Sequence, residues 1–131
     1  MNLEKLVPPL ELCKQIPEGK FAESALVWKG DLDGDPLLFP RECGICNQYG
    51  AEIAIAPAPT LAEILEELDA IFDDCEYDVC VWNSAQLGKW GVQIVVFGRT
   101  ANHIEYDANP ATAALKLWME VNKETTNDRH F

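Results

Sequence analysis

The sequence predicts an α+β domain with a mostly antiparallel sheet of about five to six strands, two main helices on one face and a short N-terminal helix. Three observations predict this class. Stretches rich in β-branched and aromatic residues are separated by short turns, and two segments carry apolar residues at helical spacing. The connections between successive strands are too short for parallel crossovers. The expected order is α-β-β-β-α-β-β-β-α, in one domain of 131 residues whose tail frays over 122–131.

The first half of the chain predicts a short helix and three strands. The helix begins at Pro8 and Pro9, because proline suits the first helical turn, and it ends near Pro17. Alternating and β-branched residues predict the strands, and Pro57 is expected to stop the third of them. The expected strands are 24–29, 37–41 and 52–56.

The second half contains two well-marked helix starts. Thr60 and Glu63 form a capping box, in which each side chain accepts a hydrogen bond from the other residue's backbone N–H. Asn109 caps the last helix, with Pro110 at its first position. Each helix has one apolar stripe, so both are expected to pack on the same face of the sheet. The stripes are Leu61, Ile64, Leu65, Leu68 and Phe72, then Ala114, Leu117, Trp118 and Val121; the intervening strands are expected at 77–82, 91–97 and 103–106.

Charge and cysteine content restrict the function and the compartment. Ten Lys and Arg residues against 22 Asp and Glu give a net charge of −12, which disfavours direct binding to nucleic acid or to an anionic membrane. The N-terminal residues lack the pattern of a secretory signal, and the most apolar stretch, 92–97, is too short to span a bilayer. Five cysteines are an odd number for a disulfide-stapled domain, which favours the cytoplasm. Cys13 and Cys80 are expected to act as small buried hydrophobes.

Four segments carry a family resemblance. They are Asn2–Lys14 (NLEKLVPPLELCK), Ser24–Trp28 (SALVW), Ala58–Leu65 (APTLAEIL) and Asn109–Trp118 (NPATAALKLW). Together they resemble a family of small uncharacterised proteins found in bacteriophages and prophages of gut bacteria. The resemblance implies a protein made inside a bacterial host cell. The family has no assigned activity, so it implies no catalytic residue.

Two loops resemble metal or redox motifs. Cys43 and Cys46 form a Cys-x-x-Cys, but neither the helix start of a redox motif nor a second cysteine pair at zinc-ribbon spacing follows. The acidic loop 31–35 resembles the start of a calcium loop, but Pro36 stands at the sixth position, where that loop needs glycine. Plain loops are the favoured interpretation, and we expect no metal and no cofactor.

Catalytic motifs are weak in this sequence. No Gly-x-Ser-x-Gly elbow and no phosphate-binding glycine loop is present. His103, Glu105 and Asp107 are expected on one face of a strand, without a nucleophile beside them. The sequence therefore favours a non-enzymatic protein. A small metal-binding or hydrolytic protein that uses clustered carboxylates or cysteines is the alternative.

The distribution of charge is the most informative feature. No Lys or Arg lies between Arg41 and Lys89, whereas ten acidic residues do. On the helix that begins at Thr60, the acidic side chains project away from the apolar stripe. They either solvate the surface or form a docking surface for a basic protein of the host or the phage, in which the carboxylates stand in for DNA phosphates.

Trp82 and Trp90 flank the turn between the strands expected at 77–82 and 91–97. Trp82 is expected in the core, and Trp90 is expected to be exposed as an interface anchor. The candidate interaction face is Glu63, Glu66, Glu67, Asp69, Asp73, Asp74 and Trp90. The oligomeric state does not follow from the sequence.

Overall fold

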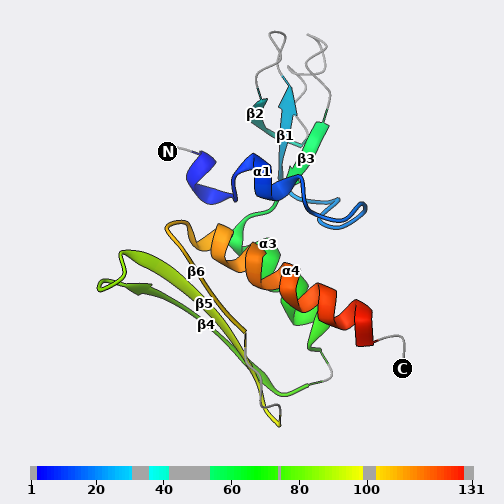
Figure 1. Ribbon diagram of the computed structural model, residues 1–131. Coiled ribbons are helices and arrows are strands. Elements are labelled where there is room, and N and C mark those ends of the chain that lie inside the picture. The colour runs from blue at the N-terminus through cyan, green and yellow to red at the C-terminus, as the bar shows by residue number, and fades with distance from the viewer. Residues whose placement is uncertain (1–2, 31–35, 42–53, 74, 99–102, 129–131) are drawn as a thin grey trace. The chain divides into compact units, whose positions relative to one another are not determined.

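The chain forms two compact units, each with its own small sheet. The computed structural model describes residues 3–30, 36–41, 54–73, 75–98 and 103–128. The units are Met1–Glu63 and Ile64–Phe131, and the division falls in the first turn of a helix. Each unit holds one three-stranded antiparallel sheet (Figure 1). The α+β class and the antiparallel pairing are confirmed, the single sheet of five to six strands is wrong, and the single domain stays a prediction.

The first unit contains two short helical segments and the first sheet. A 3-10 helix precedes α1, so the element order differs from the predicted one at its start, and α1 is shorter than expected. β1 lies between β2 and β3, and its central residues Val27 and Trp28 are buried together with Val7, Cys13 and Phe21. Cys13 is thus a buried hydrophobe, as predicted. The bounds are η1 Leu3–Leu6, α1 Leu10–Cys13, β1 Leu26–Gly30, β2 Pro36–Pro40 and β3 Ala54–Ala58.

Prolines occupy special positions in the outer strands of this sheet. The backbone N–H of Arg41 donates to the carbonyl of Ala25 at 2.8 Å, so Ala25 and Arg41 form a hydrogen-bonded pair at the end of the β1–β2 ladder. Because bonded and non-bonded pairs alternate in an antiparallel ladder, Pro36 and Pro40 direct their nitrogens away from β1. The same alternation applies to Pro57, opposite Val27. β3 therefore continues through Pro57 to Ala58, although the sequence predicts that it stops there.

These prolines give a physical reason for two separate sheets. A single large sheet would need β2 or β3 to pair on its outer side with a strand of the second unit. Proline has no N–H to donate to such a pair. The outer sides of β2 and β3 therefore lack donors at Pro36, Pro40 and Pro57.

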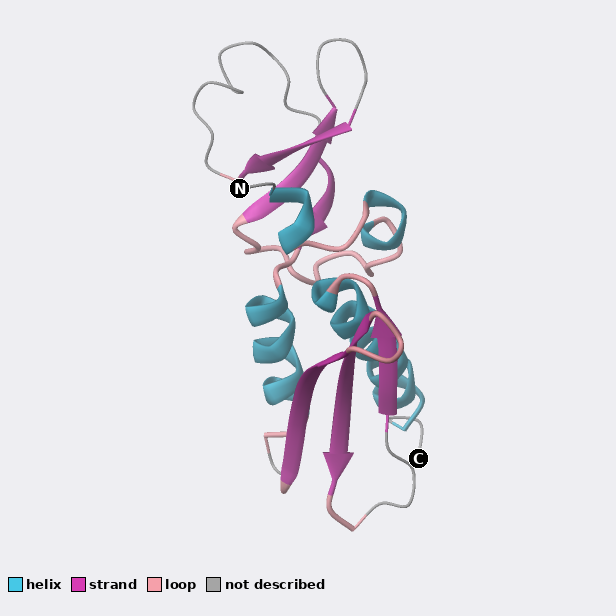
Figure 2. Cartoon of the chain, turned by 90° about the vertical axis from the view of Figure 1, so that its left-hand side faces the viewer, coloured by secondary structure: helices cyan, strands magenta, loops and turns pink. Residues whose placement is uncertain are grey.

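The second unit packs two helices on one side of its sheet, as predicted (Figures 1 and 2). β5 is the central strand, and its residues Val92, Ile94 and Val96 are buried. α4 contacts β5 and β6, and Leu117 and Trp118 on α4 are also buried. The bounds are α3 Leu61–Ile71, β4 Tyr77–Ser84, β5 Lys89–Val96, β6 His103–Asp107 and α4 Pro110–Asp128.

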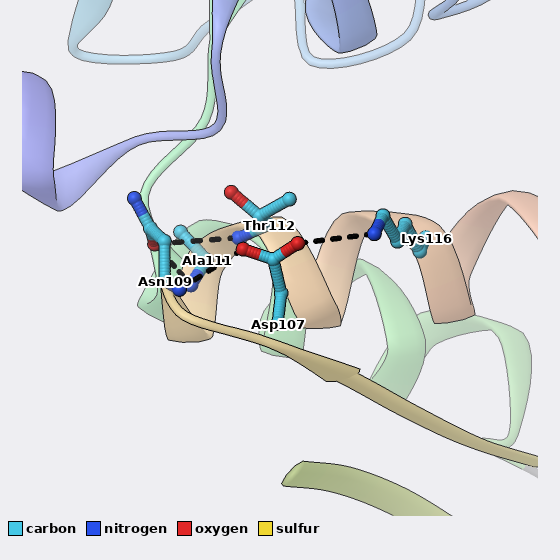
Figure 3. A network of polar contacts seen from close by, with 5 residues as sticks. All are labelled: Asp107, Asn109, Ala111, Thr112 and Lys116. Carbon is cyan, nitrogen blue, oxygen red and sulfur yellow. Dashed lines mark hydrogen bonds and ion pairs between the residues drawn. The ribbon is translucent and has the colours of Figure 1, made fainter. Parts of the chain in front are cut away.

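Side chains at the end of β6 fix the start of α4 (Figure 3). Asn109 Oδ1 accepts hydrogen bonds from the backbone N–H groups of Ala111 at 2.8 Å and Thr112 at 3.4 Å, so the predicted cap is confirmed. Asp107 accepts from the backbone N–H of Asn109 and from Lys116 Nζ, both at 3.0 Å. α4 then continues to Asp128, beyond the point where the sequence predicts fraying, since each further residue of a formed helix adds a backbone hydrogen bond.

Among the described residues, no helix combines the length and the apolar character needed to cross a bilayer.

Candidate functional site

The outward side of α3 is acidic. Glu66 and Asp69 are exposed, and their spacing of three residues places them on one side of the helix, whereas Asp73, also exposed, follows in the turn after α3. Ile64 and Leu68 are fully buried on the other side. The predicted orientation of this helix is thus confirmed, and we call Glu66, Asp69 and Asp73 the acidic surface.

Glu63 does not belong to this surface, although the sequence assigns it there. Its carboxylate accepts hydrogen bonds from the backbone N–H of Thr60 at 2.9 Å and from that of Ala25 at 2.9 Å. Thr60 Oγ1 in turn accepts from the backbone N–H of Glu63 at 3.4 Å, so the capping box is present. Glu67 is half-buried, and Asp74 lies outside the described residues.

Tyr77 joins the acidic surface to the beginning of β4. Its hydroxyl donates to Asp69 Oδ1, and its ring packs against Phe72 with centroids 5.6 Å apart. The pKa of Tyr77 is raised to about 12, first by the hydrogen bond to Asp69, then by burial and by the negative charges of Asp69 and Asp73. The first residue of β4 therefore lies in a negative potential. Glu76 and Asp78, on either side of it, are also exposed.

The two tryptophans of the hairpin lie on the faces opposite to those expected. Trp90 is opposite Asp107 in the ladder, which places it on the helix side of the sheet, and it is half-buried. Trp82 lies on the other face, where its ring meets Tyr106 edge-on at 5.8 Å. Gly91 permits this position, because a Cβ there would lie 2.5 Å from the ring of Trp82. Trp90 is thus not the exposed anchor that the sequence predicts.

The cysteines also divide between core and surface. Burial raises the pKa of the Cys13 thiol to about 11, and its Sγ donates to the carbonyl of Pro8 at 3.4 Å. Cys80 is exposed, so the prediction that it is a buried hydrophobe is wrong. The physical reason is register, since Cys80 shares the outer face with Trp82. Cys43, Cys46 and the loop 31–35 lie outside the described residues.

The structure also bears on the metal and catalytic candidates. The described residues contain no group of three or more His, Cys, Asp or Glu side chains that could hold a metal ion. His103, Glu105 and Asp107 share one face of β6, as predicted. This face is the helix side, where the Asp107 carboxylate pairs with Lys116 on α4. The position of Asp107 at the start of α4 therefore gives it a structural role.

A hollow in the first unit has a volume of about 480 Å³ and was not indicated by the sequence. Apolar side chains such as Val27 and Ile55 line it, together with Lys20 and Arg41. The Arg41 guanidinium already donates to the carbonyl of Ser24 at 2.7 Å and to Ser24 Oγ at 3.0 Å. The Arg41 guanidinium is thus engaged in holding the chain beside β1.

Comparison with known proteins assigns no family to the chain. No protein-family model, no curated protein and no solved structure matches it.

Proposed function

We propose that this chain is a non-enzymatic protein of phage or prophage type that acts in the bacterial cytoplasm by binding a basic partner protein. The observation that carries the proposal is the acidic surface, in which Glu66 and Asp69 on α3 and Asp73 in the turn after it are all exposed. No Lys or Arg occurs between Arg41 and Lys89 to neutralise it. Such a single-sign surface attracts partners of opposite charge and accelerates their association.

The chemistry of the partner follows from the carboxylates. A host or phage protein that binds nucleic acid presents Lys and Arg to phosphates, and the same side chains pair with carboxylates. The competing interpretation is that the acidic surface only keeps the protein dissolved. If the acidic surface binds a partner, removing two of its charges reduces capture of that partner more than removing two charges elsewhere. If it only keeps the protein dissolved, the two changes have the same effect.

Zero-length carbodiimide cross-linking in a bacterial extract tests the proposal, because it joins a partner's lysine directly to a carboxylate. We expect cross-links at Glu66, Asp69 and Asp73. We expect capture to fall in the variant Glu66→Gln/Asp73→Asn and in high salt, since the screening length shrinks from about 10 Å at 0.1 M to about 3 Å at 1 M.

The variant Glu18→Gln/Glu23→Gln is the matched control. It removes the same number of charges from exposed positions of the first unit. Equal capture by the wild type and both variants, at low and high salt alike, would contradict the proposal. Loss of capture in the Glu66→Gln/Asp73→Asn variant alone would support it.

A further inference from the structure

One edge of the second sheet has a regular, unpaired backbone. β4 is an outer strand of eight residues, and its pairing with β5 has no register shift. The N–H of Phe97 donates to the carbonyl of Glu76 at 3.0 Å, so these two residues form a hydrogen-bonded pair. Because bonded and non-bonded pairs alternate along the ladder, every second residue of β4 from Tyr77 onward directs its N–H and C=O groups away from β5. Among the described residues no strand pairs with that side. The outward-directed residues are Tyr77, Val79, Val81 and Asn83.

This edge lacks most of the features that normally protect an outer strand. Proteins block such edges with proline, charged side chains (lysine above all), bulges, very short strands or a covering helix or loop. Of these, β4 has one charged residue, Asp78, which repels other acidic strands but not basic ones. β4 contains neither proline nor lysine, and it is longer than β6, which has five residues. In the first sheet, proline occupies the outward positions 36 and 40 of β2, on either side of Leu38, and the outward position 57 of β3. The β4 edge therefore keeps a complete row of donors and acceptors.

The apolar side chains at this edge are only partly covered. Val79 and Val81 point to the helix side of the sheet and are half-buried. Their ladder partners Ile94 and Val92 are fully buried. Both valines thus keep part of their surface in water, although α3 and α4 lie on this side of the sheet. One further strand beside β4 would remove the two valines from water, which is favourable by the hydrophobic effect.

The charges around the edge determine what kind of strand fits. The acidic surface meets the beginning of β4 through the hydrogen bond between Asp69 and Tyr77, and Glu76 and Asp78 are exposed beside it. A second copy of this chain would bring the same carboxylates to the edge, and its own β4 carries no Lys or Arg. A segment with Lys or Arg instead gains favourable pairing.

We infer that the outer edge of β4 receives an extended, Lys- or Arg-containing segment of the partner protein as a fourth strand of the second sheet. Main-chain hydrogen bonds to Tyr77, Val79, Val81 and Asn83 supply the pairing, and alternate apolar side chains of the segment cover the two valines. The inference rests on the proposed function, and it specifies the site and the conformation of the bound segment.

Synthetic peptides test the inference on the full chain. The probe is an eight-residue peptide of alternating Lys and Val with blocked ends. One control peptide carries N-methyl groups on two neighbouring central residues, which removes donors from both of its edges while keeping every side chain and charge. A second control has Glu in place of Lys. We expect the probe to bind and to slow the amide hydrogen exchange of Tyr77, Val79, Val81 and Asn83, and we expect both controls to bind at least about tenfold more weakly.

Two matched variants test the same edge from the side of the protein. Val81→Pro removes one outward N–H from β4, where proline is sterically tolerated, and should weaken binding of the probe about tenfold. Ile104→Pro makes the same change at an outward position of β6 and should leave binding unchanged. The exchange measurement on the wild type keeps the test decisive if Val81→Pro fails to fold.

The possible outcomes separate this inference from the proposed function. Equal binding of the N-methylated peptide, or no slowing of exchange along β4, would overturn the fourth strand. If the Glu66→Gln/Asp73→Asn variant still loses its protein partner in that case, the proposed function stands without it. A dimer of the wild type that Val81→Pro dissociates would overturn the inferred occupant in favour of a second copy.

Discussion

In the first unit, the central strand β1 lies between two short strands that carry Pro36, Pro40 and Pro57 at outward positions. In the second unit, the central strand β5 lies between β4 and β6, which contain no proline. Both sheets have three antiparallel strands, so their pairing is alike. Their edges differ in whether the backbone can accept another strand.

This difference shows that burial and edge protection are separate properties of a sheet. The first sheet buries the central part of β1, and prolines remove outward donors from both of its outer strands. The second sheet buries β5 equally well but leaves β4 with free donors and half-covered valines. A partner strand is consequently expected only in the second unit.

The largest effect should come from removing the support of the second sheet. Trp118 on α4 is 1% exposed, so Trp118→Ala should lower the free energy of unfolding by about 3–5 kcal/mol. Urea unfolding followed by circular dichroism measures it. Leu87→Ala, at a turn residue that is 57% exposed, is the control and should change stability by less than about 0.5 kcal/mol. A loss below about 1 kcal/mol for Trp118→Ala would contradict the packing of α4 on β5 and β6.

The next effect concerns the negative potential at the start of β4. The pKa of Tyr77 is about 12, above the ordinary value of about 10, so the folded state holds the phenol proton more tightly. The resulting stabilisation is complete below pH 10 and is lost as the pH rises from about 10 to about 12. Asp69→Asn should lower the pKa of Tyr77 towards its ordinary value. Tyrosinate absorbance during an alkaline titration measures this shift, with Tyr77→Phe to assign the step, and an unchanged step would exclude the hydrogen bond as its cause.

A smaller effect is expected from opening an edge of the first sheet. Pro57→Val gives β3 an outward N–H and a more flexible unfolded chain, so stability should fall by about 0.4–1 kcal/mol. The variant should also associate at high protein concentration, because its edge can pair. Urea unfolding and size-exclusion chromatography at two concentrations check both effects. A more stable variant that stays at the wild-type elution volume would show that Pro57 does not protect this edge.

The smallest effect is expected from two carboxylates of α3, those of the exposed Glu66 and the half-buried Glu67. Glu66→Gln/Glu67→Gln should leave stability unchanged or raise it by a few tenths of a kcal/mol, because neighbouring like charges on a helix repel. The buried Ile64 and Leu68 on the other side support the packing. Thermal unfolding compares the variant with the wild type. A large loss of stability would show that these carboxylates hold the fold.

Local signals in the sequence were sufficient for the elements and insufficient for their assembly. The Thr60–Glu63 box and the Asn109 cap mark helix starts because the same residues make the hydrogen bonds there. The outward role of Glu63 was wrong because its second oxygen bonds the N–H of Ala25, far away in sequence. No local pattern reveals such a contact.

The faces of the hairpin could not be predicted for a similar reason. Alternation defines two faces of a strand but does not say which one the helices cover. In the structure, Trp82 and Cys80 lie on the face without helices, and Trp90 lies on the face that the helices cover. The β4 edge was also missed, although its signal is present: a strand without proline or lysine that follows an acidic helix.

The position of Trp82 over Gly91 has an optical consequence. Trp82 belongs to β4 and is half-buried on the open face, whereas Trp28 and Trp118 are buried. A water-soluble quencher reaches the indole of Trp82 and is kept from those two buried rings. A chain that settles beside β4 places its own side chains next to the Trp82 ring and shields it from the quencher. Trp90 is also half-buried, so a Trp90→Phe variant leaves Trp82 as the partly accessible tryptophan, and occupancy of the open edge can then be followed without any attached dye.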